Sequence, residues 1–190
     1  MIKFKLILFV VGFLILEACQ RNVYFNDFEK SLLEIYEEGD TLIFESDKGV
    51  LDTTYIVLKD VGYATWNPFA HERKYKVLSG TIYYGSNRIR EDNKGIGKII
   101  SIGKKHPETT WVSISHKDVS IARYYNKFSI ESWNGYKVGE RLYRFKYKGG
   151  AMLRDSVIEI ETELFFDLKQ GVVKYITNDG ELWTRINIRK

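Results

Sequence analysis

The feature that most constrains the fold is a regular alternation of side chains in residues 157–168. Apolar residues, with one threonine among them, occupy every second position there, and most of the positions between them are acidic. A period of two places alternate side chains on opposite faces of a β-strand. One face carries Ile158, Ile160, Thr162, Leu164, Phe166 and Leu168, and the other carries Glu159, Glu161, Glu163, Phe165 and Asp167. We expect the acidic face to lie in solvent, because burying an unpaired carboxylate is strongly destabilising.

Shorter runs of the same kind fill most of the chain. They are rich in aromatic and β-branched residues, which suit a pleated, half-buried surface, and Gly, Asn and Asp separate them. The expected strands are 41–46, 50–58, 63–66, 75–84, 96–102, 111–115, 119–125, 128–133, 141–147, 157–168, 172–177 and 181–188, with turns at 59–62 and 148–150. Such runs predict an all-β domain, either an antiparallel sandwich or a half-barrel.

One segment, residues 26–38, has the features of a helix. Asn26 is suited to cap its first turn, and Glu29 follows at the spacing of a capping box. The apolar residues that recur at helical spacing are Phe28, Leu32, Ile35 and Tyr36. Gly39 is suited to end the segment. We expect one N-terminal helix that plugs an end of the β domain or covers an open face.

Residues 1–19 have the features of an export signal. Lys3 and Lys5 precede an apolar run that is too short to span a membrane comfortably, and the run ends in Leu16-Glu17-Ala18-Cys19. This ending resembles the lipobox of bacterial lipoproteins. In that class the signal is cut before the cysteine, whose sulfur and amino group are then acylated. The alternative is a retained N-terminal anchor helix.

Cys19 is the only cysteine in the chain, so it has no partner for an intrachain disulfide. The lipobox resemblance implies that lipid on Cys19 holds the mature protein on a membrane. Gln20 stands where an aspartate retains Gram-negative lipoproteins in the inner membrane, which implies the outer membrane. The expected organisation is a signal peptide at 1–18, a short tether at 19–26 and a single β-rich domain at 27–190.

Three motifs follow one another near the C-terminus. They are Phe165-Phe166-Asp167, Gly171-Val172-Val173-Lys174-Tyr175 and Asp179-Gly180-Glu181-Leu182-Trp183. Together they resemble the ending of small uncharacterised Gram-negative bacterial lipoproteins, a β-meander that carries no catalytic residues. A looser resemblance is to the lipoprotein-carrier fold, a curved half-barrel with helices over its concave face. That fold implies a cavity for a hydrophobic ligand.

The charge balance and the histidines exclude several function classes. A formal net charge of +4 is well below that of a nucleic-acid-binding surface. His116 and Asp118 are two residues apart, but Lys117-Asp118 is typical of a turn and no third metal ligand is evident, while His71 and His106 are isolated. The sequence has neither a nucleophile elbow nor a dinucleotide-binding glycine pattern. We therefore expect no catalytic residue, no metal and no cofactor.

Trp66 and Phe69 are the candidate ligand-binding residues. They flank Asn67-Pro68 in an irregular stretch, where exposed aromatic rings can stack on sugars or apolar ligands. The alternative is that both rings close the end of the core. The remaining tryptophans, Trp111, Trp133 and Trp183, lie in strand patterns and are expected in the core, whereas Ser113 and Ser115 are expected to face solvent.

The predicted function is that of a non-enzymatic, membrane-anchored cell-envelope lipoprotein that binds a ligand or an envelope partner. The predicted partners are a membrane, through lipid on Cys19, and an unknown envelope ligand or protein, without nucleic acid. One alternative is an envelope hydrolase that uses a histidine, and another is a structural subunit of an envelope assembly. An apolar cavity would favour the first function, a cluster of histidine, carboxylate and serine the second, and a flat exposed apolar patch the third.

Overall fold

The computed structural model describes residues 21–64, 75–86, 96–117, 119–133, 135–153 and 156–187, with the backbone alone for 148–153 and 156–160. The predicted signal peptide, residues 1–18, lies outside the described residues. The predictions for Cys19, Trp66, Phe69, His71 and Asp118 also concern residues outside them.

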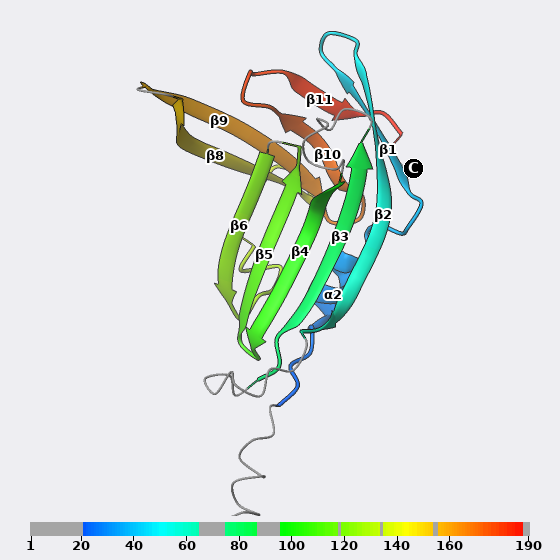
Figure 1. Cartoon of the computed structure of the whole chain (residues 1–190), viewed down its shortest axis with the longest axis vertical. Coiled ribbons are helices and arrows are strands. Elements are labelled where there is room, and N and C mark those ends of the chain that lie inside the picture. The colour runs from blue at the N-terminus through cyan, green and yellow to red at the C-terminus, as the bar shows by residue number, and fades with distance from the viewer. Residues whose placement is uncertain are drawn as a thin grey trace, which may run out of the picture.

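The described strands form one antiparallel sheet of eleven strands, in the order β6-β5-β4-β3-β2-β1-β11-β10-β9-β8-β7. The sheet curls into a half-barrel whose two outer strands, β6 and β7, do not pair with each other (Figure 1). The all-β prediction is confirmed, and the half-barrel is the one of the two expected architectures that forms.

The elements in chain order are α2 (Asp27–Leu33), β1 (Thr41–Ser46), β2 (Leu51–Tyr63), β3 (Leu78–Ser86), β4 (Ile96–His106), β5 (Thr109–His116), β6 (Val119–Asn126), β7 (Tyr136–Lys137), β8 (Leu142–Leu153), β9 (Ser156–Asp167), β10 (Gly171–Ile176) and β11 (Leu182–Arg185).

Two strands run through segments that were predicted to be turns. β2 continues through 59–62, because these residues pair with 79–82 of β3. β8 continues through 148–150, which pairs with 159–161 of β9. Pairing with a neighbouring strand therefore outweighs the local preference of Gly and Asp for turns.

One predicted strand does not form, and the predicted helix is shorter. Residues 128–133 form turns in place of a strand, and the N–H of Trp133 donates to the carbonyl of Ile130 at 3.4 Å. The helix ends at Leu33, whereas the sequence favoured Glu38. Beyond it, Tyr36 turns into the core with 1% of its surface exposed, and Gly39 takes a φ of +90°. The chain thus leaves the helical conformation after Leu33 and buries the Tyr36 side chain in the core.

The alternation in β9 sets the two faces of the half-barrel. Thr162, Leu164 and Phe166 point into the core with at most 2% exposure, as predicted, and Glu161 is exposed. The expectation of a fully solvated acidic face is wrong at Glu163, which is 6% exposed. Arg144 of β8 donates to it at 2.6 and 2.7 Å, and Lys146 contacts it at 2.8 Å. These cations supply the charge that makes burial of this carboxylate tolerable.

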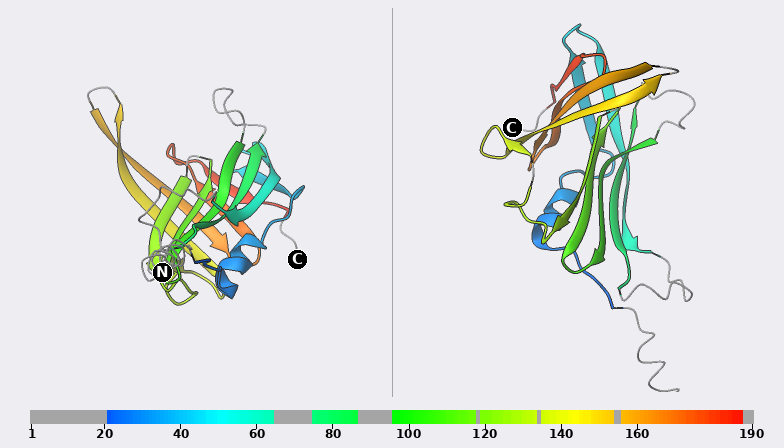
Figure 2. Two further views of the ribbon diagram at one scale, coloured as in Figure 1. Left: turned by 60° about the horizontal axis from the view of Figure 1, so that its bottom comes forward. Right: turned by 90° about the vertical axis from the view of Figure 1, so that its left-hand side faces the viewer.

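Helix α2 lies in the concavity of the sheet (Figure 2). The predicted capping box is confirmed, because Asn26 accepts from the N–H of Glu29 at 2.8 Å and Glu29 accepts from the N–H of Asn26 at 2.7 Å. Leu33 packs so closely on β3 that a Cβ atom at Gly80 would lie 2.5 Å from its Cδ1. Glycine at position 80 is therefore what lets the helix approach the strand.

A buried ion pair joins the helix to β4 and β5. Lys104 Nζ lies 2.9 and 2.8 Å from the two carboxylate oxygens of Glu29, and the hydroxyl of Thr110 donates to the same carboxylate at 2.5 Å. The side chains of Lys104 and Glu29 are 6% and 0% exposed. Every part of the network has a partner, which is the condition for burying such charges without a large loss of stability.

Aromatic side chains fill much of the remaining concave side. Trp133 stacks on Phe128 with ring centroids 5.4 Å apart and lies 5.9 Å from Phe166. Trp133 and Trp183 are buried, as predicted. Trp111 is only half-buried and belongs to the convex face, so its assignment to the core is wrong.

Candidate functional site

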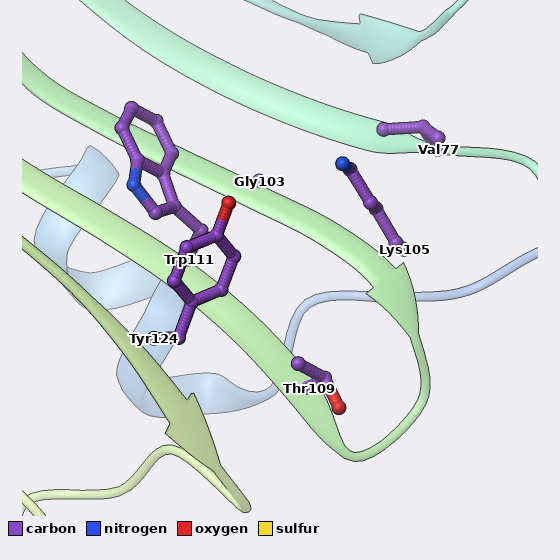
Figure 3. Close-up of a pocket in the computed structure, with 6 residues that line it drawn as sticks. All are labelled: Val77, Gly103, Lys105, Thr109, Trp111 and Tyr124. Atoms are coloured by element: carbon purple, nitrogen blue, oxygen red, sulfur yellow. The ribbon is translucent and has the colours of Figure 1, made fainter.

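The described residues contain a groove on the convex face of the sheet, near the turn between β4 and β5 (Figure 3). Its volume is about 230 Å³, and it is lined by Val77, Gly103, Lys105, Thr109, Trp111 and Tyr124. These residues come from β4, β5, β6 and the segment that enters β3. Four adjacent parts of the chain therefore build one surface feature.

The strand register explains why the groove forms. Gly103 pairs with Ser79 on one side and with Trp111 on the other, and Trp111 pairs with Tyr124. The two aromatic side chains thus stand next to each other on one flank, and Lys105 and Val77 lie on the other side of Gly103 (Figure 3). Because Gly103 has no side chain, it leaves the floor of the groove open between them.

The groove combines apolar walls with two polar groups. Tyr124 is 70% exposed and Trp111 half-buried, so both rings are accessible. Lys105 supplies an exposed ammonium group at one edge, and Thr109 supplies a hydroxyl group. Apolar walls with a few placed polar groups are typical of small-molecule sites. This arrangement suits an amphipathic ligand that has an apolar part and an anionic or hydrogen-bonding group.

A signal in the sequence was sufficient to place Trp111 on this face. Ser113 and Ser115 alternate with buried residues of β5, and both were expected to face solvent. A period of two puts Trp111 on the same face as those serines. Trp111 was expected in the core because it lies in a strand pattern, whereas its position in the alternation with Ser113 and Ser115 indicates the convex face.

His116 lies on the other face of β5, in the centre of the core. It is fully buried, and its ring centroid lies 4.7 Å from Phe44, 4.7 Å from Tyr175 and 5.1 Å from Tyr84. Neither ring nitrogen has a hydrogen-bond partner within the described part of the chain. Burial, together with the charge of Lys117, lowers the pKa of His116 to about 3. The imidazole is therefore neutral at neutral pH and is shielded from solvent.

His106 sits at a different place and is exposed. Its ring packs edge-on against Tyr75 at 5.0 Å, and its Nδ1 accepts from the N–H of Glu108 at 3.3 Å. In the described ranges, no serine or carboxylate side chain is hydrogen-bonded to His106 or His116. The structure thus does not bring either histidine together with a nucleophile.

A second buried ion pair lies beside His116. Lys117 Nζ is 2.9 and 3.0 Å from the carboxylate oxygens of Asp52, and the hydroxyl of Ser86 donates to Asp52 at 2.9 Å. Lys117 has a φ of 54° at the turn between β5 and β6, as expected for a turn. Lys117 Nζ also donates to the Ser86 hydroxyl, so the carboxylate, the ammonium group and the hydroxyl group are all hydrogen-bonded to one another.

No family model matches this chain, and no curated protein or solved structure matches it. Among the described residues, no group of three or more His, Cys, Asp or Glu side chains is arranged to hold a metal ion. In the same residues, no helix is both long and apolar enough to cross a membrane.

The depressed pKa of His116 predicts how stability depends on pH. In the unfolded chain the pKa of this histidine is near its ordinary 6.5, whereas in the folded protein it is about 3. Between these values only the unfolded state binds the proton, so stability is full above pH 6.5 and falls as the pH drops toward 3. From pH 7 to pH 5 the loss due to His116 is roughly 2 kcal/mol.

Urea unfolding of the wild type and of His116→Phe at both pH values measures this difference. Phenylalanine keeps a ring in the aromatic cluster but cannot bind a proton, so the variant should lack that part of the pH dependence. His106→Gln is the matched control and should keep it, because His106 is exposed. An equal pH dependence in the wild type and His116→Phe would contradict the assignment.

Proposed function

We propose that this protein is a lipid-anchored cell-envelope protein that binds an amphipathic ligand or partner through its convex groove. The groove carries the proposal, because it presents two accessible aromatic rings and a lysine on three adjacent strands. The anchor is supported by the lipobox-like sequence Leu16-Glu17-Ala18-Cys19.

The position of the first described residue is compatible with a short lipid tether. Its first described residue, Arg21, forms a parallel bridge with Tyr75. Cys19 precedes Arg21 by two residues, so lipid on Cys19 would hold the folded domain directly at the membrane. One acyl chain contributes about 0.8 kcal/mol per buried CH₂ group, and stable anchoring takes more than one such chain.

The non-enzymatic part of the proposal is supported by the state of His116. A general base that works near neutral pH needs a pKa near that pH and access to the substrate. The pKa of His116 is about 3, and its ring is enclosed by Phe44, Tyr84 and Tyr175. The convex groove offers rings, an ammonium group and a hydroxyl group, which are groups for binding.

The anchor is tested by metabolic labelling. Cells that produce the protein are grown with a fatty-acid probe, and we expect the probe to label the wild type. Cys19→Ser should abolish the label, because it removes the only thiol of the chain. A Cys19→Ser protein that stays labelled would contradict acylation at this residue.

The groove is tested with a fluorescent apolar dye. Residues 20–190 contain every described residue, and we expect them to bind 1-N-phenylnaphthylamine. Trp111→Ala should weaken this binding roughly tenfold, since that loss corresponds to about 1.4 kcal/mol of ring contact. Ile96→Ala is the control, because Ile96 is 58% exposed at the opposite end of β4. Equal affinities for the two variants would show that the dye binds elsewhere.

A further inference from the structure

We propose that the groove-bearing end of the half-barrel rests on an anionic phospholipid bilayer. Trp111 and Tyr124 then lie in the headgroup layer, and Lys105 lies against lipid phosphates. This inference rests on the proposed anchoring through Cys19, and it names the partner of the same groove.

The position of the chain's first described residue places the groove beside the anchor. The carbonyl of Arg21 accepts from the N–H of Lys76 at 2.9 Å, and Val77, the next residue, lines the groove. An extended chain spans at most about 3.5 Å per residue, so the Cα of Cys19 lies within about 7 Å of that of Arg21. A lipid on Cys19 thus enters the bilayer close to this groove.

Other features of the same end match a bilayer interface. Tyr63, at the end of β2, donates its hydroxyl to the carbonyl of Val23 at 2.5 Å, and the neighbouring Tyr24 is 71% exposed. The N-terminal segment and the turn between β4 and β5 lie at this one end of the sheet (Figures 1 and 2). Tyrosine and tryptophan are enriched where membranes meet water, because each has an apolar body and a polar tip.

The charges around the groove suit an anionic surface. Lys105 lies in the groove, while Arg21 and Lys76 belong to the segments that meet next to it. Each such cation near an anionic membrane contributes about 1 kcal/mol of attraction. The nearby acid Glu108 has a cationic partner, Lys127, at 3.9 Å.

A bilayer also accounts for the exposed rings better than free solution does. Tyr124 stands 70% exposed beside Trp111, on a surface next to the anchor. In water these rings would expose apolar area, and contact with the headgroup layer removes part of it from water. The lipid anchor makes this contact intramolecular in effect, so weak individual contacts are enough to orient the domain.

The test uses the full-length protein, expressed with its signal and reconstituted into vesicles. Tyr124→Cys is labelled with an environment-sensitive thiol dye, and Ile96→Cys at the opposite end of β4 is the matched control. In vesicles of phosphatidylglycerol and phosphatidylethanolamine, we expect the Tyr124→Cys emission to shift to shorter wavelength. A spin-labelled lipid should quench it several times more than the control. Adding Lys105→Glu should reduce both effects.

Two outcomes would overturn the inference. One is that the dye at position 124 has the same emission wavelength in vesicles, and the same weak quenching by spin-labelled lipid, as the dye at position 96. The other is that the emission at position 124 shifts to shorter wavelength only when a soluble polysaccharide is added. That result would mean that the groove binds polysaccharide and does not face the bilayer. Failure of the anchor is recognised separately, because unacylated wild-type protein would itself react with the thiol dye through Cys19.

Discussion

The carboxylate of Glu29 is the point on which the described structure depends most. It caps helix α2 by accepting from the N–H of Asn26, and it accepts from Lys104 of β4 and Thr110 of β5. At 0% exposure, it would be severely destabilising without these partners. One charge therefore joins the start of the helix to two neighbouring strands and fixes how the concave side is filled.

The same ion pair also determines the convex face. Lys104 and Thr110 are register partners on the inside, so their neighbours Lys105 and Trp111 point outward. A shift of this register by one residue would exchange the two faces and remove the groove. The interior contact and the proposed binding surface are thus two consequences of one strand pairing.

Local patterns in the sequence were sufficient to predict much of this fold. The core positions 162, 164 and 166 of β9, the capping box at Asn26 and the strand Thr41–Ser46 all depend on near neighbours, and each is confirmed. The predictions of turns at 59–62 and 148–150 were wrong, because pairing with another strand decided the structure of those segments. Burial of Glu163 was missed for the same reason, since its partner Arg144 comes from another strand. The groove could not be predicted from the sequence, because it depends on the register of four strands. The alternation in β5 was nevertheless sufficient to place Trp111 on the convex face.

The pair of Glu29 and Lys104 holds α2, β4 and β5 together, and a double-mutant cycle measured by urea unfolding is the most direct test of this role. Lys104→Met alone leaves a buried carboxylate without its cation and should lower the free energy of unfolding by about 3–5 kcal/mol. Adding Glu29→Gln should recover a large part of that loss, because no buried charge is then left. The exposed pair of Lys127 and Glu108, at 3.9 Å, should show a coupling below about 1 kcal/mol. Small and additive losses for Glu29→Gln and Lys104→Met would contradict the account.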